Sequence, residues 1–319
     1  MRAFIFPGQG SQAVGMGAAL ADASAVAREV FGEVDEALGQ NQRRLMAEGP
    51  ADELTLTENA QPAIMANAIA TLCVLTREGG VVLADKADYV AGHSLGEYTA
   101  LCAAETFDLA TTARLLTRRG QAMQAAGPVG EGAMAALLGA DVAKAETIAG
   151  AAIDSILAEG GEPLVCTVAN DNDPSQVVIS GHRVAVERAV TLAKELGAKR
   201  AVLLPVSAPF HCSLMEDAAR AMEAALAEAE LRAPLVPVFA NVDAVAVAEP
   251  GAIRRLLVEQ VTGRVRWRES VLAMVEAGVT EFVEFGGKVL APMVKRIAPD
   301  VEAISVVSMD DVEALLKRL

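Results

Sequence analysis

Apolar residues along the chain follow two kinds of spacing: short continuous runs, and longer stretches in which they recur with helical periodicity. The short runs are typical of buried strands and the longer stretches of amphipathic helices. Outside a central segment, we predict strands at residues 2–6, 87–92, 236–240, 280–285 and 303–307. We predict helices at 25–38, 61–77, before residue 104, at 108–124, 214–230, 252–261, 269–277, 288–297 and at the C-terminus. Strands that alternate with helices imply a mostly parallel sheet covered on both faces.

The central segment has a different pattern, which begins after the glycine-rich break at 127–132. Its strand-like runs lie at 133–138, 164–168, 176–180 and 200–204, with helices after Asp141 and at 184–196. The order strand–helix–strand–strand–helix–strand is ferredoxin-like and forms a compact unit that can be inserted into a larger domain. We therefore predict an α/β fold in two domains. Residues 1–129 and 207–319 form a large α/β-hydrolase-like domain with a mostly parallel sheet, and residues 130–206 form an inserted ferredoxin-like small domain.

Composition narrows the possible functions. Hydrophobic residues make up 53% of the chain and charged residues 22%, so the chain can bury a substantial core. A formal net charge of −15 opposes binding to nucleic acid or to an anionic membrane surface. The 4 cysteines lie far apart without metal-ligand spacing, which argues against a disulfide framework or a zinc site. With no targeting or membrane-spanning segment apparent, we expect a cytoplasmic protein.

Gly92-His93-Ser94-Leu95-Gly96 has the G-x-S-x-G pattern and lies between a predicted strand and a predicted helix. A sharp strand-to-helix turn would hold Ser94 in a strained conformation, with its hydroxyl exposed at the helix N-terminus. Backbone N–H groups and the helix dipole favour a developing oxyanion there. A chance match in a Gly/Ser turn is the alternative; we favour a nucleophilic serine.

A nucleophilic serine needs a base, and the chain contains only 3 histidines. The side chain of His93 should diverge from Ser94 on a tight turn, which leaves it a structural or electrostatic role. His182 begins a small-domain helix and is expected at the surface or in a cap. His211 lies where the chain re-enters the large domain, from which it can reach the edge of the sheet. We therefore predict His211 as the general base for Ser94.

Three motifs together carry a family resemblance. Phe6-Pro7-Gly8-Gln9-Gly10-Ser11-Gln12, Gly92-His93-Ser94-Leu95-Gly96-Glu97-Tyr98 and Phe210-His211-Cys212 follow one another along the chain. With the inserted ferredoxin-like unit, they resemble the malonyl-CoA:acyl carrier protein transacylases of type II fatty acid synthesis. The acyltransferase domains of polyketide and fatty acid synthases are similar. The combination is specific, whereas G-x-S-x-G alone is shared with many hydrolases.

The resemblance implies roles for individual residues. Ser94 would accept the acyl group and His211 would act as its base. The backbone N–H groups of Gln9 and Leu95 would form the oxyanion hole. The main-chain carbonyl of Gln260 would orient His211, which makes the site a Ser–His dyad with no acidic third member.

Arg119 is the candidate for substrate selection. A malonyl group carries a free carboxylate, and a guanidinium can hold a carboxylate with two parallel hydrogen bonds. An acetyl group would leave the buried guanidinium unpaired. The resemblance places this role on the arginine directly before Gly120, hence on Arg119, whereas Arg118 is expected to be a solvated helix residue.

Three further residues are weaker candidates for substrate contact. Phe210 would narrow the pocket beside the malonyl C2 and disfavour branched acyl groups, with ordinary core packing as the alternative. Asn170 and Asn172 lie in a predicted loop between small-domain strands. They resemble polar residues that line the cleft of the family and would contact the pantetheine arm, with turn formation as the alternative.

The resemblance also implies a mechanism and its partners. The reaction would be a ping-pong transfer in which malonyl-CoA and the phosphopantetheine-bearing acyl carrier protein are substrates, with no cofactor and no metal. We expect a monomer that binds neither nucleic acid nor membrane. Because carrier proteins are typically acidic, docking would need a local basic patch. Its candidates are Arg264, Arg266, Arg268, Lys288, Lys295 and Arg296.

Other functions remain open from the sequence. A trans-acting acyltransferase of a polyketide pathway would share every motif. A serine thioesterase or hydrolase would share Ser94 and His211 but would not need Arg119. A non-catalytic module that binds carrier proteins would not need the nucleophile, so the intact motif disfavours it.

Overall fold

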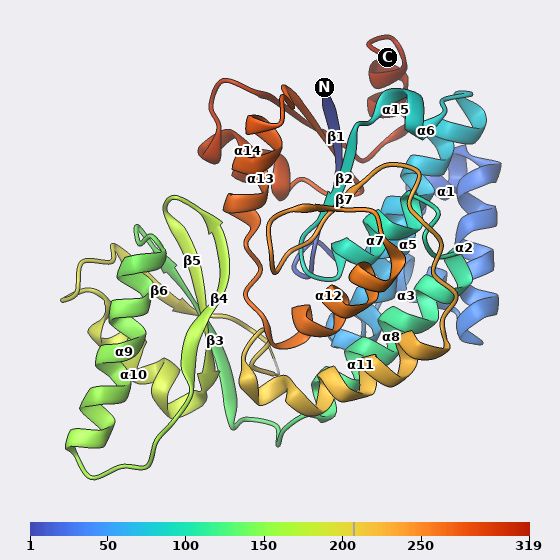
Figure 1. The fold of residues 1–319 in the computed structure, drawn as a ribbon. Coiled ribbons are helices and arrows are strands. Elements are labelled where there is room, and N and C mark those ends of the chain that lie inside the picture. Colours follow the sequence, from blue (N-terminus) through green and yellow to red (C-terminus); the bar gives the residue numbers. More distant parts are fainter. Residues whose placement is uncertain (207) are drawn as a thin grey trace.

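The computed structural model describes residues 1–206 and 208–319, and it contains two separate sheets (Figure 1). The large sheet has the order β10-β9-β1-β2-β7-β8, in which every pair is parallel except β7 with β8. Its strands are β1 (Arg2–Phe6), β2 (Tyr89–Gly92), β7 (Val238–Phe239), β8 (Ala246–Val247), β9 (Glu281–Phe285) and β10 (Glu302–Val306).

Helices cover both faces of this sheet, as its pattern of buried residues requires (Figure 1). Side chains alternate along a strand, so Phe4 and Phe6 face one layer while Ala3 and Ile5 face the other. The first layer contains α1 (Ala18–Ala23), α2 (Ala25–Leu38), α5 (Thr57–Cys73), α7 (Gly96–Ala103), α8 (Leu109–Ala125), α11 (Glu216–Glu228), α12 (Pro250–Thr262) and α15 (Met309–Leu316). The second contains α13 (Trp267–Glu276) and α14 (Leu290–Ile297), with Trp267 fully buried against the sheet.

The small sheet is antiparallel and has the order β4-β5-β3-β6. Its strands are β3 (Gly132–Leu138), β4 (Cys166–Asp173), β5 (Gln176–His182) and β6 (Arg200–Leu203). Helices α9 (Val142–Ala158) and α10 (Arg183–Ala193) pack on one face and form a separate apolar core with it. The predicted fold class is thereby confirmed. The boundary at 130–206 stays a prediction, and Ser207, where we placed the return to the large domain, lies outside the described residues.

Several predicted elements differ from the observed ones. Strand β4 extends to Asp173, so Asn170 and Asn172 lie in a strand and not in the loop that we predicted. The predicted helix at 61–77 is α5 followed by a π-helical turn at Val74–Glu78. The short elements α1, α3 (Gln42–Glu48), α4 (Ala51–Thr55), α6 (Leu83–Lys86) and β8 were not predicted. The predicted helix at 214–230 begins with a 3-10 turn at Ser213–Met215 before α11.

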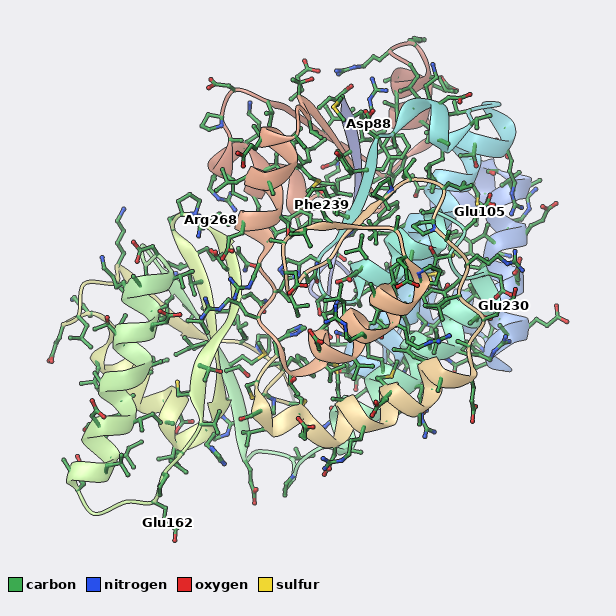
Figure 2. All side chains as sticks on the ribbon, in the orientation of Figure 1. Asp88, Glu105, Glu162, Glu230, Phe239 and Arg268 are labelled. Atoms are coloured by element: carbon green, nitrogen blue, oxygen red, sulfur yellow. The ribbon has the colours of Figure 1, made fainter. Side chains whose placement is uncertain are left out.

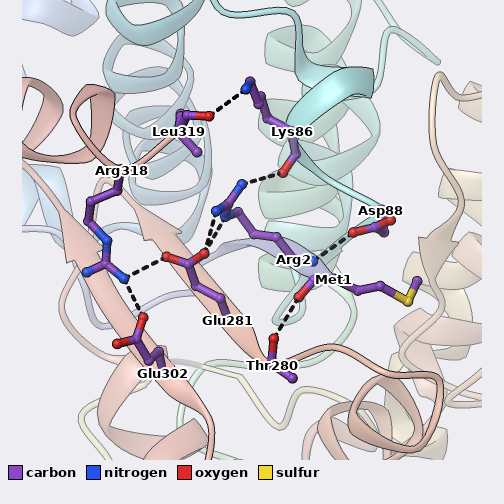
Figure 3. A network of polar contacts seen from close by, with 9 residues as sticks. All are labelled: Met1, Arg2, Lys86, Asp88, Thr280, Glu281, Glu302, Arg318 and Leu319. Carbon is purple, nitrogen blue, oxygen red and sulfur yellow. Dashed lines mark hydrogen bonds and ion pairs between the residues drawn. The ribbon is translucent and has the colours of Figure 1, made fainter.

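A polar network closes the edge of the large sheet where its parallel strands begin (Figure 3). Arg2 on β1 forms an ion pair with Glu281 on β9 at 2.6 Å and donates to the carbonyl of Lys86. Arg318 contacts Glu281 and Glu302, and thereby links the C-terminal segment to β9 and β10. The carboxyl ends of the strands lie at the opposite edge, which in open α/β sheets is the edge that carries the functional site.

The two sheets are joined by hydrogen bonds and ion pairs between β4 and the chain around α13. Val265 donates its N–H to the carbonyl of Ala169 at 2.8 Å and accepts the N–H of Asp171 at 2.9 Å. Arg268, which is labelled in Figure 2, lies at the start of α13. It forms an ion pair with the buried Asp171 at 2.9 Å. None of the helices in the described ranges is long and apolar enough to span a bilayer.

Candidate active site

The turn after β2 holds Ser94 in the left-handed region, with φ of 54°. Two glycines make this turn possible, because a Cβ on Gly92 would lie 1.8 Å from the carbonyl oxygen of Gly96. A Cβ on Gly96 would lie 2.3 Å from the carbonyl oxygen of Phe6, at the end of the neighbouring β1. The turn is therefore packed so closely that side chains are excluded on both sides of the serine. This is the geometry of a nucleophile elbow.

Asn241, which follows β7 at the same sheet edge, braces the turn from the other side. Its Oδ1 accepts the N–H of Ser94 at 2.8 Å, and its Nδ2 donates to the carbonyl of Gly92 at 2.7 Å. One buried amide thus fixes both sides of the turn. Such a contact offsets the strain of a non-glycine residue at positive φ.

The Ser94 hydroxyl contacts a histidine that the sequence places far away. Oγ lies 2.7 Å from Nε2 of His211, and Nδ1 of His211 lies 2.9 Å from the main-chain carbonyl oxygen of Gln260. A carbonyl can only accept, so Nδ1 carries the proton and the Nε2 lone pair faces the hydroxyl. Burial, followed by the positive charge of Arg119, lowers the pKa of His211 to about 3. The imidazole is therefore neutral near pH 7 and can accept the serine proton.

Arg119 contacts the same hydroxyl from α8. Nη2 donates to Ser94 Oγ at 3.1 Å and to Gln260 Oε1 at 2.9 Å, while Nη1 donates to Gln61 Oε1 at 2.9 Å. The side chain is 1% exposed, and within the described ranges its Nε–H has no acceptor. A buried guanidinium whose hydrogen-bond partners are all neutral costs free energy, and an anion bound beside it would offset that cost.

A glycine next to Arg119 explains how α8 comes so close. A Cβ on Gly120 would lie 2.5 Å from the Cα of Glu58, at the start of α5. Glycine therefore allows α8 to pack directly against the helix that carries Gln61. The guanidinium is held from two helices and the nucleophile turn at once.

These groups line a cavity of about 230 Å³ between the two sheets. Of the predicted site residues, the cavity wall contains Gln9, Ser94, Arg119, Asn170, Phe210 and His211. Gln260 and Leu95 lie behind the wall and are buried. The cavity is therefore built from residues that are distant in sequence. Within it, the Ser94 hydroxyl lies beside the imidazole of His211 and the guanidinium of Arg119.

The comparisons with known proteins agree on one family. Residues 3–295 match the family described as an acyl transferase domain. The chain is 42% identical to the malonyl CoA-acyl carrier protein transacylase of Bacillus subtilis (strain 168), over 99% of this chain and 96% of that protein. The crystal structure of acyl-carrier-protein-S-malonyltransferase from Bartonella henselae has 51% identity and a TM-score of 0.94, covering 99% of this chain and 98% of that one. The chain belongs to the malonyl CoA-acyl carrier protein transacylase family. This confirms the resemblance and the predicted class of enzyme, an acyltransferase.

A further solved relative is a complex. A malonyl-transacylase bound to its type II polyketide synthase acyl carrier protein has a TM-score of 0.93 and 38% identity, and it covers 100% of this chain and 99% of that one. The transacylase fold of this chain is therefore also found with a carrier protein bound.

In this transacylase, the three histidines have different contacts, as their positions in the sequence predict. His93 turns away from Ser94, and its Nε2 lies 2.8 Å from Oδ1 of Asn172. His182 accepts the N–H of Val165 at 2.8 Å within the small sheet. Only His211, among the described residues, contacts the serine.

The structure corrects the expectation for Asn172 and refines that for Asn170. Asn172 is buried against His93 and is not among the residues that line the cavity, so the predicted loop position is wrong, and its contact with a pantetheine arm stays a prediction. Asn170 does line the cavity. In a regular strand, residues two positions apart face the same side, but Asn170 and Asn172 do not. Register shifts in β4 between Val168 and Asn170 and between Asp171 and Asp173 account for this difference.

The basic cluster is also corrected. Four of its arginines form ion pairs: Arg264 with Glu146, Arg266 with Glu269, Arg268 with Asp171 and Arg296 with Asp173. Lys295 donates to two main-chain carbonyls. The pairs of Arg264, Arg268 and Arg296 join the two domains, so the arginines of the cluster are paired with carboxylates and are not a free basic patch. Docking of a carrier protein at this cluster stays a prediction.

Three residues of the site were missed from the sequence. Asn241 follows a predicted strand, and its position at the carboxyl end of that strand is a signal that could have found it. Glu97 lies within the serine motif but received no role. Gln61 gave no signal, because it is one of several polar residues in a helix whose residues, Gln61 included, are mostly buried.

Proposed function

We propose that this transacylase moves a malonyl group from malonyl-CoA to the phosphopantetheine thiol of acyl carrier protein, for fatty acid biosynthesis, by a ping-pong mechanism through a malonyl-Ser94 ester. One observation carries the proposal: Ser94 Oγ is in contact with both His211 Nε2 and Arg119 Nη2. A hydrolase needs the first contact, whereas the second provides a cation for an acyl group that carries its own anion.

In the first half-reaction, Ser94 Oγ attacks the thioester carbonyl carbon while its proton passes to Nε2 of His211. Negative charge develops on the carbonyl oxygen, where the main-chain N–H groups of Gln9 and Leu95 would donate. The C–S bond then breaks, and the departing sulfur takes the proton from His211. The products are the malonyl-Ser94 ester and free CoA.

Two features of the fold support the proposed roles of these N–H groups. Leu95 directly precedes α7, so its N–H lies among the groups at the helix N-terminus that lack an intrahelical acceptor. A Cβ on Gly8 would lie 2.7 Å from the carbonyl oxygen of His93, so glycine lets the chain after β1 run directly beside the serine turn. Gln9 is the next residue and lines the cavity.

The second half-reaction uses the same atoms in reverse. His211 takes the proton of the phosphopantetheine thiol, and the sulfur attacks the ester carbonyl carbon. The intermediate collapses with cleavage of the C–O bond, and His211 returns the proton to Ser94 Oγ. Because a thioester and an oxygen ester differ little in energy, one base and one oxyanion hole can serve both directions.

Arg119 would select the malonyl group. Its guanidinium lies beside the hydroxyl that becomes acylated and has donor capacity left, so the malonyl carboxylate can take it up. Phe210, buried at the cavity wall next to His211, would leave little room for a branch at C2. Asn170 lines the same cavity, which supports its proposed contact with a pantetheine arm.

The polyketide alternative is favoured by one observation, the likeness to a malonyl-transacylase that binds a type II polyketide synthase carrier protein. Both pathways would use the same chemistry at Ser94, and they differ in the carrier protein that is accepted. Rates with carrier proteins of the two kinds distinguish them.

Isotope exchange tests the covalent mechanism. A ping-pong enzyme exchanges labelled CoA into malonyl-CoA without carrier protein, because the first half-reaction is complete on its own. Initial rates at several fixed carrier-protein concentrations should give parallel double-reciprocal lines. The Ser94→Ala variant is the control and should show no exchange. Exchange that requires carrier protein would contradict the proposal.

A further inference from the structure

Glu97 is a buried carboxylate next to the active site that the transfer reaction does not use. It lies in the first turn of α7, three residues after the nucleophile, and is 2% exposed. Its Oε2 accepts the Nε2–H of Gln260 at 2.8 Å and the main-chain N–H of Asn241 at 3.1 Å. Glu97 therefore holds the two residues that brace the nucleophile turn and orient the base.

Glu97 is also connected to the positive charge of Arg119. Every hydrogen-bond acceptor that Arg119 has within the described ranges is neutral: the side-chain oxygens of Gln61, Ser94 and Gln260. Buried charges are stable when an opposite charge compensates them. Glu97 is the carboxylate that reaches Arg119 through a single amide.

The Gln260 side-chain amide lies between the two charges, and only one orientation of the amide satisfies both contacts. Arg119 is donor-only, so the amide oxygen must face it, and the amide nitrogen then faces Glu97. The amide dipole lies between cation and anion with the favourable orientation. The same nitrogen also donates to the main-chain carbonyl of Ser94 at 2.9 Å, which couples this chain of contacts to the nucleophile.

The charge on Glu97 is balanced between opposing influences. Burial, with a smaller contribution from the Asp243 charge, raises the pKa of Glu97, and the net value with all influences included is about 7. The hydrogen bonds from Asn241 and Gln260 and the positive charge of Arg119 lower the pKa of Glu97. His211 is neutral near pH 7 and adds no charge of its own. Neutralising Arg119 would therefore remove an influence that keeps Glu97 ionised.

We propose that Glu97 is the buried counter-charge of Arg119 in the free enzyme, and that it takes up a proton when a malonyl carboxylate binds the guanidinium. The inference rests on the proposed function, because it requires that carboxylate on Arg119. The proton comes from solvent when the malonyl group binds and returns to solvent when the group leaves on the carrier protein. Two carboxylates then never share one buried cation. Glu97 is in this sense a positioning residue, since it acts on the substrate through Gln260 and Arg119.

Calorimetric binding measurements on the Ser94→Ala variant test the proposal without turnover. Binding of malonyl-CoA is measured at about pH 8 in two buffers with different ionisation enthalpies, and the difference gives the number of protons taken up. Acetyl-CoA is the matched ligand, since it carries the same CoA and cancels its titrations. We expect uptake approaching one proton with malonyl-CoA beyond that with acetyl-CoA. The malonyl-to-acetyl affinity ratio should fall by up to about tenfold per pH unit above pH 7.

A second substitution, Glu97→Gln, separates charge from packing. Glutamine keeps an acceptor for Gln260 and Asn241 but cannot titrate, so the extra proton uptake should vanish and the affinity ratio should become independent of pH. At pH 8 malonyl-CoA should bind the double variant about tenfold more tightly than the Ser94→Ala parent, because the competing anion is gone.

The outcomes separate this inference from the proposed function. Preferential malonyl binding without extra proton uptake in the Ser94→Ala protein would overturn the role of Glu97 and leave the transfer function intact. A pH-dependent ratio that persists in the Glu97→Gln protein would do the same. If malonyl-CoA bound no better than acetyl-CoA at any pH, the role of Arg119 in the proposed function would fail as well. Should Glu97→Gln not fold, the proton count on the Ser94→Ala protein decides alone.

Discussion

Ser94 and His211 are 117 positions apart in the chain, yet Oγ and Nε2 lie 2.7 Å from one another. Both residues have positive φ, 54° for Ser94 and 58° for His211. Each is therefore held in a backbone conformation that non-glycine residues rarely adopt, and the surrounding contacts must stabilise it. Strain at two residues that meet in a cavity is typical of a functional site.

Replacing Arg119 should separate malonyl from acetyl transfer. In Arg119→Ala, kcat/KM for malonyl-CoA should fall on the order of 10²-fold or more, because a buried charge-assisted contact is lost. Acetyl transfer should change far less. Arg119→Lys keeps the charge without the planar fork and should lie between the two. Equal losses for both acyl groups would refute the assignment.

The low pKa of His211 should appear as a dependence of stability on pH. In the unfolded chain this histidine binds a proton below its ordinary pKa of 6.5, whereas in the fold it binds one only near pH 3. The unfolded state therefore binds more protons than the folded state between these two pH values. The contribution of His211 to the free energy of unfolding thus declines as pH falls below about 6.5, by up to about 1.4 kcal/mol per pH unit.

The matched variant for that measurement is His211→Gln, studied by urea unfolding between about pH 4 and pH 8. His93 is buried too, and burial lowers its pKa in the same direction. The quantity to compare is therefore the difference in slope between the native protein and the variant. A variant as sensitive to acid as the native protein would show that His211 is protonated in the fold.

Asn241 should be needed for the nucleophile turn. Asn241→Ala leaves the Ser94 N–H and the Gly92 carbonyl without their partner and should lower the free energy of unfolding by about 1–3 kcal/mol. Asn241→Asp keeps the acceptor for Ser94 but cannot donate to Gly92, and it adds a charge near Glu97. Both variants should lose kcat more than they raise KM for malonyl-CoA. Unchanged activity in a folded Asn241→Ala protein would show that the brace is dispensable.

A glycine substitution tests the tightness of the turn directly. Gly92→Ala places a Cβ 1.8 Å from a backbone oxygen, so the turn must move and activity should be lost, with a large drop in thermal stability. Gly32→Ala is the control, since no heavy atom lies within 4 Å of the added Cβ on that glycine in α2. The control should be neutral or more stable by about 0.5–1 kcal/mol. Similar behaviour of the two variants would argue against the close packing.

The sequence predicted the layout of the fold because its elements have strong local signals. Helix α2 matches the predicted range 25–38, and Asp108 and Asp141, where two helices were predicted to begin, cap α8 and α9. Strand β4 was placed wrongly because the polar run from Asn170 to Asp173 has the composition of a turn. In the structure Asp171, Asn172 and Asp173 are buried, and β4 contacts α13 and α14, including the pairing of Asp171 with Arg268. No local pattern in the sequence shows such contacts.

The site divides in the same way. Ser94 and His211 could be predicted, since a motif and the scarcity of histidine single them out. Arg119 needed the family resemblance, because nothing local distinguishes it from Arg118. The links among Glu97, Asn241 and Gln260 could not be predicted at all, because each depends on the relative placement of α7, α12 and the segment after β7.

Intact mass spectrometry after mixing with malonyl-CoA tests the central claim most directly. The account predicts one malonyl adduct, located by peptide mapping on Ser94, absent from Ser94→Ala and discharged when carrier protein with its phosphopantetheine thiol is added. Rapid malonylation of the carrier protein with no adduct on Ser94, or with an adduct on another residue, would contradict it.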